Sequence, residues 1–401
     1  MLRAEYSQTR KSAVLQLPRV KKFLDGIGRN SNHSMIAYSI GLTHFNNFII
    51  KRYNNNENQN QNLDCESILN PLSANEISVY DLLDSFVSNI LEDRKGISPK
   101  TVSLYVSAIR SYLAYYDIDV IPSKFKRKVK MPKFYREDEE PIDVADIRKI
   151  LLSCNNRRLK TLILVLASGG MRVTEALATR YMDLDFSVSP TKIHLRKEYS
   201  KTKVARDVYI SDEATAYLKQ WLDWKYNNPI KEREFKKEDL VFTVHTSEPR
   251  KAGMRGMYVK VWQEFQRLLT IAKMDDRKGD DSDSNTNTAN ANAIILRNRR
   301  KITIHSLRRF VKTVISEQAG QDYSEYFLGH SKSPYWTMKE AKRREIYKTS
   351  IMKYLTFLDY STLETTGKNI EAKLNEKDKQ IQILSTKYDE DIKILKDAVA
   401  D

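Results

Sequence analysis

Residues 159–177 read LKTLILVLASGGMRVTEAL, an apolar run that stops at two glycines and continues into a charged turn. The apolar half predicts a buried helix, because a helix with apolar residues on every face must lie inside a core. Gly169 and Gly170 predict the end of this helix, and Arg172 then lies at the turn into a second one. A guanidinium and nearby backbone N–H groups could share one anion there. Arg172 is therefore a candidate anion ligand, although a simple cap or an ion pair with Glu175 explains it as well.

Two further segments carry candidate chemistry. Residues 192–210, KIHLRKEYSKTKVARDVYI, contain two short alternating apolar runs around a polar turn, which predicts a β-hairpin. Residues 303–310, TIHSLRRF, place His305 three residues before Arg308. On a helix this spacing puts an imidazole and a guanidinium on one face, where they could grip a phosphate, although a lone His-x-x-Arg also occurs by chance. The pattern predicts a mainly α domain with a small β-sheet.

The preceding part of the chain predicts a separate helical domain over residues 1–133. After Ser98-Pro99, a cap and first-turn pair, apolar residues recur at helical spacing from Val102 to Leu113. The tract at 53–62, YNNNENQNQN, has nothing to bury and predicts a loop. Asp143 predicts the cap of the first helix of a second domain, which we expect to span residues 141–360.

A basic segment lies between these two domains, at residues 123–137, SKFKRKVKMPKFYRE. Like charges at this density repel one another unless an anion such as a phosphate backbone lies alongside, so we predict a linker that follows DNA. A merely solvated charge run is the alternative. The candidate DNA-binding residues are Lys124, Lys126, Arg127, Lys128, Lys130 and Lys133.

The composition is that of a basic folded protein. The 401 residues carry a formal net charge of +16, which attracts polyanions, and 41% are hydrophobic, which is enough for real cores. The sequence has two cysteines, no apolar run long enough to span a bilayer and no apolar leader. These features predict a cytoplasmic protein without membrane contact. The acidic and Asn/Thr-rich stretch at 275–293 predicts a loop insertion, and residues 363–401 predict a terminal helix that could pair as a coiled coil.

Four motifs follow one another in order: GGMRVTEAL at 169–177, SKTKVAR at 200–206, TIHSLRRF at 303–310 and LGHS at 328–331. In the order of these motifs the chain resembles the tyrosine recombinase, or phage integrase, family. Its PYW and KYLTFLDY strings also resemble the archaeal integrases. The resemblance covers Asp143 to Asp359. It implies the family's catalytic fold, preceded by a helical, SAM-like core-binding domain.

Motif by motif, the resemblance implies a role for each candidate. Arg172 and Arg308 would hold the non-bridging oxygens of the scissile phosphate, where charge grows in the transition state. Lys201, with Lys203 as the fallback, would protonate the departing 5′ oxygen. His305 and His330 would assist proton transfer or bond the phosphate, although His330 could instead simply end a helix after Gly329.

The nucleophilic tyrosine departs from the family's spacing, because Lys339 stands nine residues after His330. Tyr347 in REIYKTS has the best local match and is our expected nucleophile. Tyr335 and Tyr354 are the alternatives. Tyr354 precedes three large apolar residues, so we expect it to pack in the core.

The resemblance implies a site-specific recombinase that cuts and rejoins double-stranded DNA through a 3′-phosphotyrosyl intermediate. Four protomers would act on two DNA sites, with no small-molecule substrate, no metal and no other cofactor. The rival hypotheses are a type IB topoisomerase-like strand transferase and a DNA-binding relative that has lost catalysis.

Overall fold

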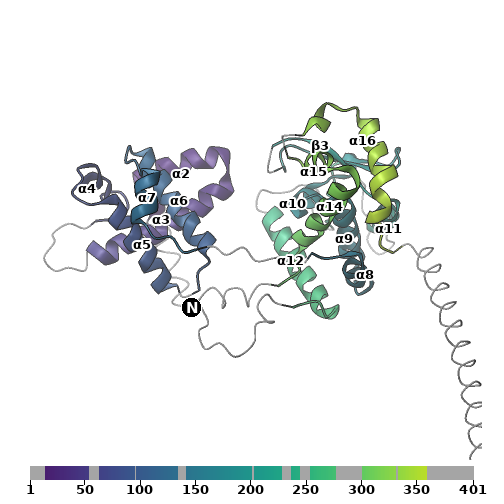
Figure 1. Ribbon diagram of the computed structural model, residues 1–401. Coiled ribbons are helices and arrows are strands. Elements are labelled where there is room, and N and C mark those ends of the chain that lie inside the picture. The colour runs from purple at the N-terminus through teal and green to yellow at the C-terminus, as the bar shows by residue number, and fades with distance from the viewer. Residues whose placement is uncertain are drawn as a thin grey trace, which may run out of the picture. The chain divides into compact units, whose positions relative to one another are not determined.

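The structure is a computed structural model that describes residues 14–53, 63–94, 96–133, 141–200, 203–227, 236–243, 253–276, 300–330 and 333–358. The chain divides into two compact units between Glu139 and Glu140, each with its own apolar core (Figure 1). Nearly all of the predicted loop at 53–62, the insertion at 275–293 and the terminal helix at 363–401 lie outside the described residues. None of the described helices combines the length and apolarity needed to cross a bilayer.

The described part of the N-terminal unit is helical. Its elements are α2 (Pro18–Asn30), α3 (Asn32–Tyr53), α4 (Leu69–Ser73), α5 (Val79–Asp93), α6 (Pro99–Tyr115) and α7 (Pro122–Lys128). The predicted helix after Ser98-Pro99 is confirmed as α6: the Ser98 side chain accepts from the N–H of Thr101, and Val102, Val106, Ile109 and Leu113 are all buried.

The first part of the predicted basic linker is an element of this unit. Residues 122–128 form α7, whose Phe125 lies under the guanidinium of Arg110 at 4.6 Å. Val129 is buried, and the backbone N–H of Lys130 donates to Asp84 at 2.8 Å. Because these contacts fix its backbone, at least this part of the basic segment presents its charges from a defined helix rather than from a free connection.

The C-terminal unit is mainly α with one small sheet, as the sequence predicts. Its elements are α8 (Val144–Leu152), α9 (Arg157–Gly169), α10 (Val173–Ala178), η1 (Tyr181–Asp183), β1 (Leu184–Asp185), β2 (Lys192–Leu195), β3 (Arg206–Tyr209), α11 (Asp212–Tyr226), α12 (Gly253–Ile271), α14 (Ile304–Ala319), α15 (Gln321–Phe327), η2 (Pro334–Thr337), α16 (Glu340–Ile346), η3 (Tyr347–Ile351, a π-helical turn) and η4 (Met352–Leu355).

Helix α9 is the centre of this unit. Ten of its thirteen residues are buried, and it packs against α8, α10, α11, α12 and α14. This confirms the buried helix expected from the apolar run. The Asp143 cap of α8 is also confirmed, since its side chain accepts from the N–H of Asp146 at 2.8 Å.

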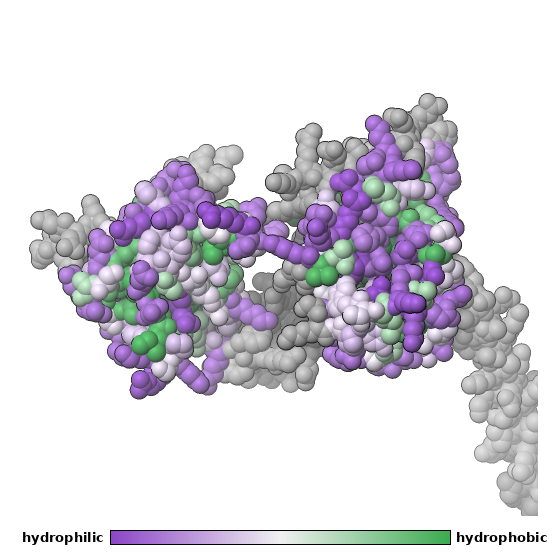
Figure 2. All heavy atoms as spheres, turned by 90° about the horizontal axis from the view of Figure 1, so that it is seen from above, coloured by the Kyte–Doolittle hydropathy of each residue, from purple (hydrophilic) through white to green (hydrophobic). Residues whose placement is uncertain are grey.

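The sheet is antiparallel in the order β1-β2-β3, with Ile193 opposite Val208 and Leu195 opposite Arg206. The predicted hairpin is therefore confirmed. In the space-filling view hydrophilic residues cover most of the visible surface, with small apolar patches between them (Figure 2). The apolar residues of α9 and of the hairpin pack in the core of this unit.

Candidate active site

The end of α9 creates the turn on which the site is built. Gly170 has a φ of +59°. This backbone conformation is strained for a residue that has a side chain, but almost unstrained for glycine. A Cβ at Gly170 would lie 2.8 Å from Cγ1 of Val311 on α14. Glycine therefore lets the chain reverse and lets α14 approach, which brings the two arginine motifs together.

Arg172 is the N-cap residue of α10, as the sequence predicts. Its backbone N–H donates to Oε2 of Glu175 at 2.8 Å, and its Nη1 donates to Oε1 at 2.9 Å. The Glu175 side chain is only 1% exposed. The ion pair that the sequence offered as the simpler explanation of Arg172 is thus present, and it holds the guanidinium at the turn.

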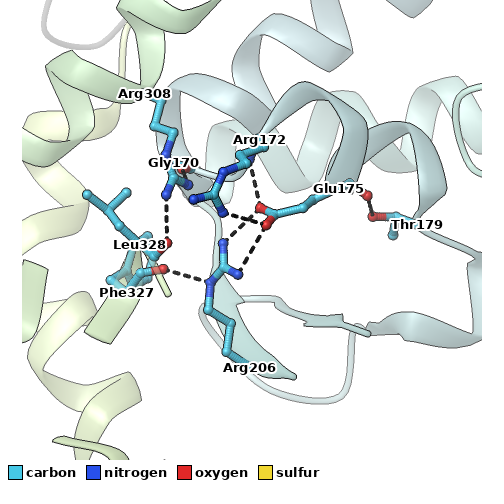
Figure 3. A network of polar contacts seen from close by, with 8 residues as sticks. All are labelled: Gly170, Arg172, Glu175, Thr179, Arg206, Arg308, Phe327 and Leu328. Atoms are coloured by element: carbon cyan, nitrogen blue, oxygen red, sulfur yellow. Dashed lines mark hydrogen bonds and ion pairs between the residues drawn. The ribbon is translucent and has the colours of Figure 1, made fainter. Parts of the chain in front are cut away.

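A second arginine, which the sequence reasoning missed, holds the other side of Glu175. Arg206 on β3 is fully buried, and its Nη2 and Nη1 lie 2.8 and 3.3 Å from the two carboxylate oxygens (Figure 3). Burial alone would raise the pKa of Glu175, but Arg206 and then Arg172 lower it below the ordinary value. The signal was the period of two in a strand, which places Arg206 on the same inward face as Val208.

Arg308 is fixed beside Arg172 by two main-chain carbonyls. Its Nη1 donates to Gly170 O at 2.5 Å and its Nη2 donates to Leu328 O at 2.6 Å, and the residue is 7% exposed. Burial and the nearby Arg172 lower its pKa to about 10, so it stays cationic at neutral pH. Figure 3 shows the two guanidinium groups next to each other at the end of α9.

His305 lies one turn before Arg308 on α14, and the residue is exposed. Partial desolvation, then Arg308 and Arg172, lower its pKa below the ordinary value of 6.5. The expected pairing of His305 and Arg308 on one helix is confirmed, and Arg172 acts electrostatically on both.

His330 follows the end of α15. Gly329 has a φ of +79°, and the backbone N–H of His330 donates to Glu325 O at 2.8 Å, which is the helix-ending role the sequence kept open. The imidazole Nδ1 contacts the Glu325 carboxylate, and Trp336 Nε1 donates to the His330 carbonyl at 3.0 Å. The ring is 41% exposed, so His330 is anchored yet reachable.

The predicted general acid, Lys201, lies outside the described residues. Lys203, the fallback, is described: it is exposed and has a φ of +54°, next to the hairpin turn. The role of either lysine stays a prediction.

Tyr347, the expected nucleophile, is fully buried. Its hydroxyl donates to Ser168 O at 3.1 Å, and its ring stacks on Phe327 with a centroid distance of 5.5 Å. Burial, then Asp212, raises its pKa well above the ordinary value. The Tyr347 hydroxyl thus lies near the arginine pair, because Ser168 is two residues before Gly170, whose carbonyl binds Arg308. In this buried position, however, no substrate can reach the hydroxyl.

The other two tyrosines differ from Tyr347. Tyr335 is half-buried and packs edge-on against Tyr323 at 5.2 Å. Tyr354 is 40% exposed, so the expectation that it packs in the core is wrong. Its neighbours take the core positions instead, because Leu355 and Phe357 are buried and η4 turns the tyrosine outward.

The segment after Tyr347 is anchored to the rest of the unit. The Glu213 carboxylate accepts from the backbone N–H groups of Phe357 and Leu358, and Arg148 Nε donates to Phe357 O at 2.8 Å. These bonds fix the end of the described chain against α8 and α11.

The candidate DNA-binding residues lie in the N-terminal unit. All six candidate residues are exposed, and Lys124 to Lys128 belong to α7. Lys128 also lies over the ring of Tyr80 at 5.7 Å. The charges are therefore available to an anion.

A mainly helical unit with a three-stranded sheet and an arginine pair at the end of its central helix defines a phage integrase type of catalytic domain. Residues 140–335 match the model of the phage integrase family, so this part of the chain is a phage integrase domain.

Two tyrosine recombinases show the similarity at the level of sequence. A tyrosine recombinase of Thermosipho africanus is 25% identical over 207 residues, which cover 50% of this chain and 64% of that protein. Tyrosine recombinase XerA of Thermococcus onnurineus is 26% identical over 149 residues, or 37% of this chain and 51% of its own. The chain thus spans less than two thirds of either relative.

A solved structure supports the fold. The structure of a lambda integrase tetramer bound to a Holliday junction aligns with a TM-score of 0.50 at 12% identity, covering 80% of this chain and 79% of that one. At this identity the likeness concerns the fold alone.

Proposed function

We propose that this protein is a site-specific DNA recombinase that cleaves and rejoins double-stranded DNA through a 3′-phosphotyrosyl intermediate. One observation carries the proposal: Arg172 and Arg308 are fixed side by side at the end of α9 with N–H groups to spare. A guanidinium has five N–H donors. Among the described residues, the Arg172 side chain uses only Nη1 on a partner and Arg308 uses one N–H on each of two carbonyls, so an anion could accept the others.

The arginine pair suits a scissile phosphate. During attack, negative charge grows on the non-bridging oxygens, and two planar guanidinium forks can bond both oxygens while they neutralise that charge. Partial desolvation, then Arg308 and Arg172, lower the pKa of His305, so its ring is neutral at pH 7 and able to accept a proton. Such a site stabilises the transition state of phosphoryl transfer through fixed cations.

The reaction is a transesterification in two steps. The tyrosine oxygen bonds to phosphorus while its proton passes to a histidine of the site, His305 or His330, the bond to the 5′ oxygen breaks, and Lys201 gives that oxygen a proton. The phosphotyrosyl bond keeps the energy of the broken one, so a 5′ hydroxyl of a partner strand can displace the tyrosine. We assign the nucleophile to Tyr347, which must leave its buried position before it attacks.

The remaining parts of the proposal concern DNA and assembly. The exposed lysines and arginine of α7 and the residues after it supply charges that a duplex would attract. The lambda integrase structure named above is of a tetramer on a Holliday junction, and we propose the same for this chain: four protomers on two DNA sites. We propose that the protein acts in the cytoplasm, where it associates with DNA.

The test uses a nicked suicide duplex, from which the cleaved end diffuses away and traps the covalent intermediate. Target duplexes are first selected from a random library by binding to the 401-residue chain. A DNA-linked peptide that contains Tyr347 supports the proposal in full. A peptide with Tyr335 or Tyr354 corrects the nucleophile, and bound duplex with no covalent product overturns catalysis in favour of a DNA-binding relative.

A second assay separates recombination from DNA relaxation. A plasmid with two selected sites yields recombinant circles if the protein exchanges strands. Supercoil relaxation without recombinants identifies a type IB topoisomerase-like enzyme instead. Arg308→Ala is the matched control, since it should bind the sites and give neither product.

A further inference from the structure

We propose that Arg206 is a positioning residue, which keeps the charge of Arg172 available to the phosphate and fixes the chain that carries His330. The inference deepens the proposed function and rests on it. Arg206 comes from neither of the two arginine motifs, and it contacts no solvent.

The burial of Arg206 requires an explanation. A charged group taken out of water is strongly unfavourable unless it is paired and hydrogen-bonded. Arg206 meets this condition with every arm of its fork: Nη1 and Nη2 bond the two oxygens of Glu175, and Nε donates to Phe327 O at 3.1 Å. A lysine could not make this planar, three-armed contact.

The charge balance shows what the pairing does for Arg172. Glu175 is buried and ionised, and both arginines contact it. Arg206 is the more buried of the two and neutralises the carboxylate, so the positive charge of Arg172 is left over for another anion. Without Arg206, Arg172 would be the only arginine of Figure 3 in contact with Glu175, and the carboxylate would draw the remaining N–H groups of Arg172 inward.

The same guanidinium supports the second half of the site. The chain at the end of α15 lies flat on it, since a Cβ at Gly329 would be 2.6 Å from Nη1 of Arg206. Phe327 O binds Arg206, the next carbonyl, Leu328 O, binds Arg308, and His330 follows two residues later. One buried side chain therefore links the hairpin, the turn of Arg172 and the loop of His330.

The experiment compares Arg206→Gln and Arg206→Lys with Arg158→Gln as the matched control. Arg158 also pairs with a glutamate, Glu264, at 2.6 Å, but at the opposite end of α9. With a saturating selected duplex, Arg206→Gln should form the covalent complex about 100-fold more slowly, because a displacement of about 1 Å in a catalytic group can cost this much. Duplex affinity should be unchanged, and Arg206→Lys should fall between wild type and Arg206→Gln.

A second readout does not depend on catalysis. The chain has six histidines, so the imidazole signals of His305 and His330 can be assigned in NMR spectra by single substitutions. Arg172 lowers the pKa of His305, and if Arg206→Gln draws Arg172 toward Glu175, the His305 pKa should rise toward 6.5. Arg158→Gln should leave it in place, although it also removes an arginine–glutamate pair.

The outcomes are distinct. If Arg206→Gln reacts as fast as wild type and leaves the His305 titration unchanged, the positioning role is wrong. If wild type itself forms no covalent complex, the proposed function fails, and the titration alone then decides the role of Arg206. If Arg206→Gln does not fold, Arg206→Lys, which keeps the charge beside Glu175, is judged by the same two readouts.

Discussion

The substitution Tyr347→Phe should remove covalent chemistry and also lower stability by a calculable amount. Ser168 lies in the last turn of α9, where carbonyl groups have no partner within the helix. The Tyr347 hydroxyl supplies that partner at 3.1 Å inside the core. Phenylalanine keeps the stack on Phe327 and deletes only this bond.

The size of the effect follows from burial. A buried carbonyl left without a donor costs about 1–3 kcal/mol. In a unit of this size each kcal/mol shifts Tm by roughly 2–4 °C. Tyr354→Phe is the matched control, because Tyr354 is 40% exposed and the structure gives its hydroxyl no buried partner among the described residues. It should leave Tm unchanged.

Two assays are needed. Thermal unfolding of wild type, Tyr347→Phe and Tyr354→Phe gives the stability, and denaturing gels after incubation with a suicide duplex give the covalent product. We expect Tyr347→Phe to have a lower Tm than wild type and to form no covalent product, while it still binds DNA. The reasoning on the nucleophile is refuted if Tyr347→Phe retains the product and Tyr354→Phe loses it. The reasoning on the buried bond is refuted if both variants melt like wild type.

Three further results are expected. Desolvation and two arginines hold the pKa of His305 below 6.5, so the unfolded chain takes up a proton first and stability falls as pH drops below 6.5. In urea unfolding measured over a series of pH values, His305→Asn should weaken this dependence of stability on pH. An unaltered dependence would contradict the prediction. Changing Lys124 and Lys126 together to Gln should reduce the slope of log affinity against log salt by about 1.8 if both face phosphates, and an unchanged slope would place them off the DNA. Gly170→Ala should lose about 1–2 kcal/mol from its left-handed backbone alone, plus the clash with Val311, which chemical denaturation measures; equal stability would mean that the turn adjusts freely.

Local patterns in the sequence were enough to predict much of the fold. The run at 159–169 specified a buried helix, and the cap at Asp143 and the alternation around Val208 specified their elements, because each depends on residues close in the chain. The side-by-side placement of Arg172 and His305-x-x-Arg308 needed the family's motif order as well. Their spacing in sequence gives no distance in space.

The rest depended on contacts between distant segments. Tyr347 is buried because α9 and α15 supply its partners from far away in sequence. The residues next to Tyr347 in the chain do not predict its burial. Tyr354 was misjudged for the opposite reason: its apolar neighbours pack, but the turn of η4 points it outward. Arg206 was missed although the strand period placed it inward, since a buried arginine is plausible only once Glu175 is found opposite.

On the proposed role of Tyr347, its enclosed position limits cleavage of DNA outside an assembled complex. A tyrosine side chain hides about 150–250 Å² in a core, so its release requires roughly 4–6 kcal/mol at 25 cal/mol per Å². Only about one free molecule in a thousand or fewer would then carry an outward hydroxyl at any moment. A protomer that meets a stray duplex would thus be a poor nuclease, and the free energy gained at a fully assembled target would have to open it.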